Sequence, residues 1–155
     1  MDSVKQPVEL TRLIKKLVGK WDGEIKIKMP DGSTLEGKGT LNAQEVVSGF
    51  GVRTEMQFDI EGFGKYEEQD LWGYQRWEKK LHMYSITTTA AVHDHVGKWE
   101  DDNTLTFGWK GLNEGEPSGE KVRLKWVSPT EIRAHEVDKE KGKVSMIIDY
   151  IFKKK

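Results

Sequence analysis

The feature that most constrains this chain is an alternation of apolar and polar residues that begins at Trp21 and recurs almost to the C-terminus. Side chains two positions apart on a β-strand share a face, so the alternation predicts strands with one buried and one solvated face, as in an antiparallel sheet. Turn-forming stretches such as Pro30 to Ser33 separate the strands. The pattern predicts about ten strands, near residues 21–29, 35–41, 52–58, 66–74, 81–89, 90–99, 104–110, 120–128, 131–138 and 144–152.

Many short strands with no helical segment between them exclude a parallel βαβ arrangement. Closing such a sheet into a barrel removes its exposed edges. Gly23, Gly37 and Gly39 lie inside strands, where they permit the sharp bends that closure demands. We therefore predict a mainly β fold, a single closed antiparallel barrel of lipocalin-like shape, formed by one domain over residues 1–155.

Before the first strand, apolar residues recur at helical spacing and predict one amphipathic helix over about residues 8–18. Pro7 lies near its first turn and Gly19 marks its end. A single helix with one apolar stripe, beside a chain otherwise rich in strands, predicts a lid or plug on the sheet.

Composition excludes several function classes. The 25 Lys and Arg residues balance 26 Asp and Glu residues, which argues against nucleic-acid binding. The chain has no cysteine, so it has no disulfide, thiolate zinc site or cysteine nucleophile. The N-terminal sequence lacks the features of a secretion signal, and no apolar run approaches the roughly 20 residues of a membrane span. We expect a soluble, cytoplasmic protein.

Two sequence segments carry a resemblance to known barrels. Leu17 to Gly23 reads Leu-Val-Gly-Lys-Trp-Asp-Gly and resembles the L-x-G-x-W-x-G opening of calycin-type barrels, which include lipocalins, fatty-acid-binding proteins and nitrobindins. Leu71 to Tyr84, with Phe107-Gly108-Trp109 later in the chain, resembles a bacterial and archaeal lipocalin-like family of unknown function. The resemblance implies the barrel fold and says little about function.

The chain departs from each named relative. It lacks the disulfide and secretion signal that lipocalins usually carry, and it shows one helix where fatty-acid-binding proteins have two. Nitrobindins bind haem through a late histidine. The late histidine here is His135, in a different surrounding sequence, so haem binding stays an alternative.

One predicted strand carries a mixed row of polar and aromatic side chains on a single face. The row consists of Tyr66, Glu68, Asp70, Trp72 and Tyr74. The opposite face of this strand is less apolar, so we expect the row to point inward and contact a ligand. Burying its two carboxylates is costly unless a cation pairs with them, and the candidate cations are Arg53, Arg76, Arg123 and Arg133. Two carboxylates on one face also suit acid–base chemistry.

His93 and His95 share one face of the next candidate strand. If that face points inward, both imidazoles contact a ligand, or bind a metal with His82, His135 or a carboxylate as third ligand. If Ala90, Val92, Asp94 and Val96 point inward instead, both histidines lie on the surface, and this is the assignment we favour.

The chain has six tryptophans, most of which we expect to pack in the core. Trp109 shares its face with Phe107 and is a further candidate to line a pocket. The function we predict is binding of a small, largely apolar ligand inside the barrel, with no catalytic residues assigned and the cofactor unknown.

Three alternatives stay open. One is a haem or metal site through His93, His95 or His135, and another is a barrel enzyme that uses Glu68 and Asp70. The third is a filled barrel that acts through protein contacts, such as a homodimer.

Overall fold

The computed structural model describes residues 3–155 and contains one α-helix, ten strands and a short 3-10 turn. The helix α1 spans Val8–Leu17 and the turn η1 spans Val47–Gly49. The strands are β1 (Gly19–Lys28), β2 (Thr34–Val46), β3 (Gly51–Ile60), β4 (Gly64–Gln75), β5 (Lys80–Thr87), β6 (Val92–Asp101), β7 (Thr104–Asn113), β8 (Glu116–Ser128), β9 (Glu131–Glu140) and β10 (Lys143–Lys154).

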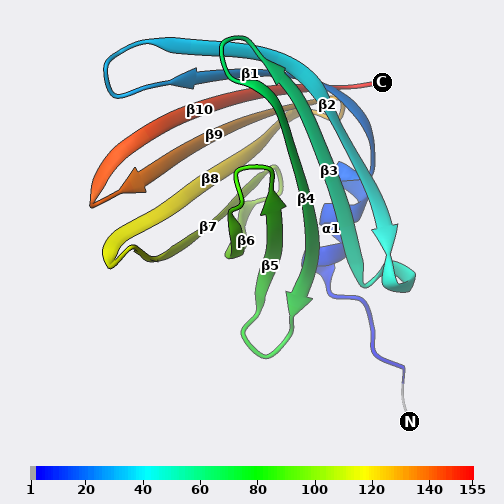
Figure 1. The fold of residues 1–155 in the computed structure, drawn as a ribbon. Helices are drawn as coiled ribbons and strands as arrows, with labels where there is room; N and C mark the ends of the chain where they lie inside the picture. Colours follow the sequence, from blue (N-terminus) through cyan, green and yellow to red (C-terminus); the bar gives the residue numbers. More distant parts are fainter. Residues whose placement is uncertain (1–2) are drawn as a thin grey trace.

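Each strand pairs antiparallel with its neighbours in sequence, and β1 also pairs with β10, which closes the barrel (Figure 1). Ile25 on β1 lies opposite Gly37 on β2 and opposite Tyr150 on β10. The closed antiparallel barrel of ten strands predicted from the alternation is therefore confirmed. The intra-strand glycines serve closure: a side chain at Gly39 would collide with the backbone carbonyl of Gln57 on β3.

Two turns differ from the sequence prediction. The sequence pattern predicts strands near 104–110 and 120–128 with a loop over 111–119 between them, but β7 and β8 extend through that segment and leave only Glu114 and Gly115 as the turn. Both turn residues have positive φ angles, 51° and 79°, as in the type I′ turns that join twisted strands. The break between β5 and β6 falls at residues 88–91 rather than between Thr89 and Ala90.

Three tryptophans hold α1 against one end of the barrel. The indole N–H groups of Trp21, Trp99 and Trp126 donate hydrogen bonds to the backbone carbonyls of Leu17, Glu9 and Lys16, over 2.9, 3.0 and 3.1 Å respectively. The carbonyls of the last helical turn have no partner within the helix, so the bonds from Trp21 and Trp126 satisfy two of them.

The apolar stripe of α1 faces the barrel, where Leu10, Leu13 and Leu17 are buried. Figure 1 shows the helix against the concave side of the sheet, so it plugs one end of the barrel. Ion pairing of Arg12 with Asp102, at 3.2 Å, ties the helix to the turn between β6 and β7. Within residues 3–155, no helix has the length and apolar character needed to cross a membrane.

Candidate functional site

The interior of the barrel holds a cavity of about 400 Å³. Leu17 of the helix contributes to its floor, and the turns at the opposite end of the barrel contribute Phe63, Thr89, Ala91 and Asn113 to its mouth. This volume lies in the range of roughly 300–1,000 Å³ that is typical of small-molecule pockets. A cavity of this volume favours ligand binding over the alternative of a barrel filled by its own side chains.

The cavity has an aliphatic wall and a polar wall. The aliphatic side chains come mainly from β1, β2, β3 and β10, which are contiguous around the barrel, and include Ile25, Ile27, Leu41, Met56, Met146 and Ile148. The acidic side chains and His93 come from β4, β6, β8 and β9 on the other side. The arrangement suits a ligand with an apolar body and one polar end.

The polar and aromatic row predicted on β4 does point inward for four of its five members. Asp70 is 4% exposed and Trp72 is 6% exposed, and both line the cavity with Tyr66 and Glu68. The Trp72 indole donates to the Thr54 hydroxyl (3.0 Å), which donates to Asp70 Oδ2 (2.7 Å), and the Tyr66 hydroxyl donates to Glu68. Tyr74, the fifth, lies outside this cavity, in a second pocket beside the N-terminal segment.

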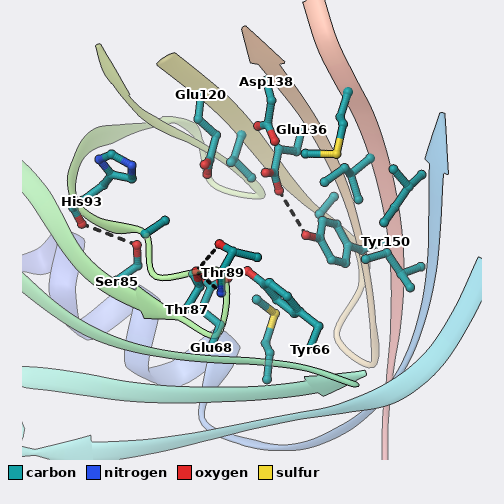
Figure 2. Close-up of a pocket in the computed structure, with 18 of the residues that line it drawn as sticks. Tyr66, Glu68, Ser85, Thr87, Thr89, His93, Glu120, Glu136, Asp138 and Tyr150 are labelled. Carbon is teal, nitrogen blue, oxygen red and sulfur yellow. Dashed lines mark hydrogen bonds between the residues drawn. The ribbon is translucent and has the colours of Figure 1, made fainter. Parts of the chain in front are cut away.

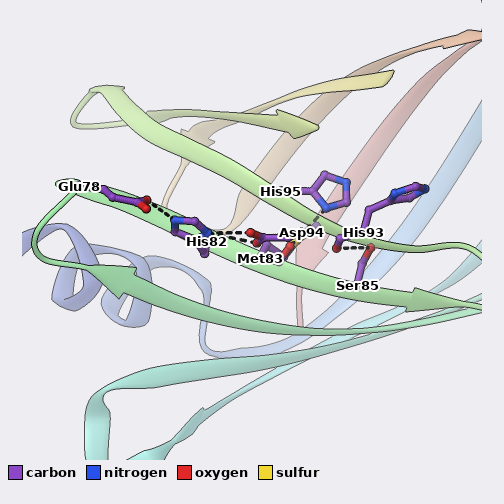
Figure 3. Close-up of polar contacts among 7 residues, drawn as sticks. All are labelled: Glu78, His82, Met83, Ser85, His93, Asp94 and His95. Atoms are coloured by element: carbon purple, nitrogen blue, oxygen red, sulfur yellow. Dashed lines mark hydrogen bonds and ion pairs between the residues drawn. The ribbon is translucent and has the colours of Figure 1, made fainter. Parts of the chain in front are cut away.

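His93 and His95 also face the interior, so the assignment that placed them on the surface is wrong. His95 is 2% exposed, whereas Val92 and Asp94 lie on the outer face (Figure 3). Trp99 shows which face of β6 points inward, because its indole must face the interior to reach Glu9 of the helix. His95 and His93 lie on the same face of the strand as Trp99. The His93 ring stacks on the indole of Trp109 with centroids 3.6 Å apart.

The other two histidines cannot complete a metal site with this pair. His82 lies on the outer surface between Glu78 and Asp94, at 2.7 and 3.0 Å (Figure 3). His135 is also outside, 2.7 Å from Asp149. A metal or haem site that combines His135 with His93 and His95 is therefore ruled out by their positions.

Three further interior carboxyl groups were missed by the sequence prediction: Glu120 on β8, and Glu136 and Asp138 on β9. Their oxygens lie within 4.8 Å of one another (Figure 2). Glu120 Oε1 is hydrogen-bonded to His95 Nε2 at 2.9 Å. Glu136 accepts a hydrogen bond from the Tyr150 hydroxyl at 3.1 Å. Glu68, Asp70, Glu120, Glu136 and Asp138 together form what we call the interior carboxyl cluster.

The arginines expected to neutralise these groups do not reach them. Arg53 pairs with Glu55 and Arg133 with Glu131, both outside the cavity, while Arg76 stacks on Trp77 and Arg123 is exposed. Of the described residues that line the cavity, Lys139 is the only lysine or arginine, and it is exposed. The cluster therefore lacks a permanent cation.

The physical consequence is a set of raised carboxyl pKa values. Burial raises the pKa of Glu136 and Asp70 well above their ordinary values, and the charges of Glu120 on Glu136 and of Glu68 on Asp70 raise them further. Burial also raises the pKa of Glu68, and it raises that of Asp138 to about 6. Burial lowers the pKa of His95, but the hydrogen bond to Glu120 and the negative charges of Glu120 and Glu68 together outweigh burial, so the pKa is raised.

These shifts predict that the free energy of unfolding falls as pH rises. A group with a raised folded-state pKa stabilises the fold below its unfolded pKa and loses that contribution as pH rises through the folded value. For Asp138 the loss runs from about pH 4 to about pH 6, and the other raised groups act in the same direction. We expect a higher urea midpoint near pH 5 than near pH 8.

The matched variants are Glu136→Gln in the cluster and Glu67→Gln on the outer face of β4, where the side chain is exposed. Glu136→Gln keeps an acceptor for Tyr150 and should reduce the difference between the two pH values. Glu67→Gln should leave it unchanged. An equal or higher urea midpoint near pH 8 than near pH 5 in the unmodified protein would contradict the raised pKa values.

Comparison with known proteins supports the architecture. Residues 6–136 match a family described as "Protein of unknown function (DUF1579)", and no curated protein matches the chain. At 12% identity, the S-type phycobiliprotein lyase CPES from Guillardia theta has a similar fold, with a TM-score of 0.71 over 96% of this chain and 93% of that one. Rv2717c from M. tuberculosis gives a TM-score of 0.75 at 13% identity, over 97% and 99% of the two chains.

A de novo designed fluorescence-activating β-barrel also resembles this chain, with a TM-score of 0.51 at 11% identity, over 93% of this chain and 98% of the design. At these identities the likeness shows the fold alone. A lipocalin-like barrel thus fits in outline, while the finer resemblance to fatty-acid-binding proteins and nitrobindins stays a prediction.

Proposed function

We propose that this chain, which belongs to the DUF1579 family, is a small-molecule binding protein that holds a largely apolar ligand in the barrel cavity. The observation that carries the proposal is the cavity itself, with an aliphatic wall facing a wall of polar groups. Apolar surface supplies most of the binding free energy in such pockets, and a few polar groups fix the orientation of the ligand.

Buried polar atoms around the cavity support the same proposal. Asp70 Oδ1, Asp138 Oδ1, Trp109 Nε1 and Ser145 Oγ are buried, belong to residues that line the cavity, and have no hydrogen-bond partner within residues 3–155. Buried polar groups are nearly always paired in folded proteins, so these atoms are available to a bound molecule. We expect the ligand to contact side chains that line the cavity on this wall: Tyr66, Glu68, Asp70, Trp72, His93 and Trp109.

The names of proteins with a similar fold support small-molecule binding by this barrel. Proteins of similar fold include one named as a phycobiliprotein lyase and a design named as fluorescence-activating. For this chain we propose the class of small, largely apolar molecules. The acid–base hypothesis for Glu68 and Asp70 stays a hypothesis, although both residues do lie in the cavity.

Native mass spectrometry of freshly purified protein, compared with its denatured mass, tests the proposal. We expect a reproducible added mass, or uptake of one molecule of 1-decanol when the protein is incubated with it. The added mass in the same spectrum distinguishes haem and a metal ion from an organic ligand. Absorption then checks haem by its Soret band, and treatment with a chelator checks a metal ion. A bare mass without uptake of decanol would contradict the proposal.

A further inference from the structure

Building on the proposed function, we infer that the ligand carries a protonated nitrogen, an amine on an apolar body, which the interior carboxyl cluster binds while the aliphatic wall holds the hydrocarbon. The inference depends on where acids and bases lie in the cavity. Five carboxyl groups from three strands line the cavity, and Figure 2 shows Glu120, Glu136 and Asp138 side by side with Glu68 across from them.

The cavity has more hydrogen-bond acceptors than donors. Three hydroxyl donors at the cluster are already engaged: Tyr66 donates to Glu68, Tyr150 to Glu136 and Thr54 to Asp70. The Trp109 indole and the Ser145 hydroxyl also line the cavity and have no partner within residues 3–155, but two such donors do not match five carboxyl groups. An ammonium group brings up to three N–H donors and no acceptor, so it matches this surplus. A carboxylate ligand would add acceptors and negative charge to a site that already has both in excess.

Asp70 gives an independent indication that a donor is missing from the protein. Its side chain is 4% exposed, and while Oδ2 accepts from Thr54, Oδ1 has no donor within residues 3–155. The Glu68 carboxyl group also lies close to Asp70 and, after burial, is the next cause of its raised pKa. A buried acceptor without a donor destabilises the fold, and a ligand N–H removes that cost.

The two walls then divide the ligand between them. Aliphatic side chains of β1, β2 and β3, such as Ile27, Leu41 and Met56, face the acidic strands across the cavity. A molecule with a charged nitrogen at one end and a hydrocarbon body would satisfy both walls at once. Charge-assisted hydrogen bonds to carboxylates are roughly twice as strong as neutral ones, so the nitrogen end should dominate selectivity.

Binding of a cation should release protons. In the free protein, raised pKa values hold protons on part of the cluster to a higher pH than on ordinary carboxyl groups. A bound ammonium favours the ionised carboxylates and displaces those protons. The other titratable groups that face the cluster are Tyr66, His93, His95 and Tyr150, with Lys139 and Glu140 at the mouth. Affinity for an amine should therefore rise between about pH 5 and pH 8.

Isothermal titration calorimetry with decylamine, 1-decanol and decanoic acid tests the inference, because the three probes share one chain length and differ in the head group. Near pH 7.5 we expect decylamine to bind at least about tenfold more tightly than decanol, and decanoic acid to bind most weakly. The heat of decylamine binding should change between buffers of different ionisation enthalpy, which reports the proton release.

The double variant Glu136→Gln, Asp138→Asn should lose the preference for decylamine while it still binds decanol, which also shows that the cavity is intact. Asp70→Asn is a milder second variant, since asparagine can still accept the Thr54 hydrogen bond, and it should lose part of the preference. Glu67→Gln, an exposed outer carboxylate, should bind all three probes as the unmodified protein does.

Equal or tighter binding of decanol or decanoic acid would overturn the amine inference and leave the proposed function standing. Binding of Mn²⁺ without binding of decylamine would also overturn it, because the cluster would then be a metal site. If none of the three organic probes binds, the proposed function itself fails.

Discussion

Replacing Trp21 by alanine is expected to lower the free energy of unfolding by about 3–5 kcal/mol, the range found for removal of a fully buried large side chain. Trp21 is 0% exposed, and its indole fills the space between β1 and α1. The substitution also removes the hydrogen bond to the Leu17 carbonyl, which leaves that carbonyl buried at the end of the helix. We expect the plug to loosen as well as the core.

Urea unfolding followed by circular dichroism measures this effect. Trp77→Ala is the matched control, since Trp77 is 79% exposed and its loss should change stability by less than about 0.5 kcal/mol. Trp21→Phe retains most of the buried ring and loses the N–H donor, so it should fall between the two. A Trp21→Ala protein as stable as Trp77→Ala would show that α1 is not held by this tryptophan.

Local pattern was enough to predict the architecture. Alternation in segments such as 21–29 fixes which side chains face inward, and a ten-strand chain with each strand beside the next leaves barrel closure as the way to remove the edges. The row on β4 was predictable for the same reason, because its aromatic members identify the inward face. The helix was predictable from its single apolar stripe, but its tryptophan contacts were not, since they join residues up to 110 positions apart.

The interior carboxyl cluster shows what the sequence left out. On β8, every second side chain from Trp126 back to Glu120 points into the barrel. On β9, the same holds from Ile132 forward to Glu136 and Asp138. Counting in steps of two from these apolar residues would have found all three acids. The pattern turns polar at these positions, and an acidic residue at the end of a strand normally faces solvent. Only the curvature of the barrel shows that these residues face a cavity.

The predictions for His93 and His95 and for the segment 111–119 were wrong for different reasons. Parity alone gives two assignments for β6, and the valines of the outer face made the wrong one look more apolar. The loop has turn-forming glycines at 111, 115 and 119 and a proline at 117, yet backbone pairing with neighbouring strands keeps it extended except at Glu114 and Gly115. Tertiary pairing overrides local propensity there.

Filling the mouth of the cavity should abolish most ligand binding. Ala91 is half-buried and lines the mouth, at the turn between β5 and β6. Ala91→Phe places a ring where a ligand must pass, and we expect it to weaken binding of the neutral apolar dye Nile red by at least about tenfold. Val92→Phe is the matched control, because Val92 is the next residue and its side chain lies on the outer face, 46% exposed.

Fluorescence titration of Nile red against these two variants and the unmodified protein is the measurement that tests the central claim, ligand binding inside the barrel, most directly. The account predicts saturable binding by the unmodified protein and Val92→Phe, and strongly weakened binding by Ala91→Phe. Equal binding by all three proteins would place the dye on the outer surface, and no binding by the unmodified protein would contradict an accessible interior pocket.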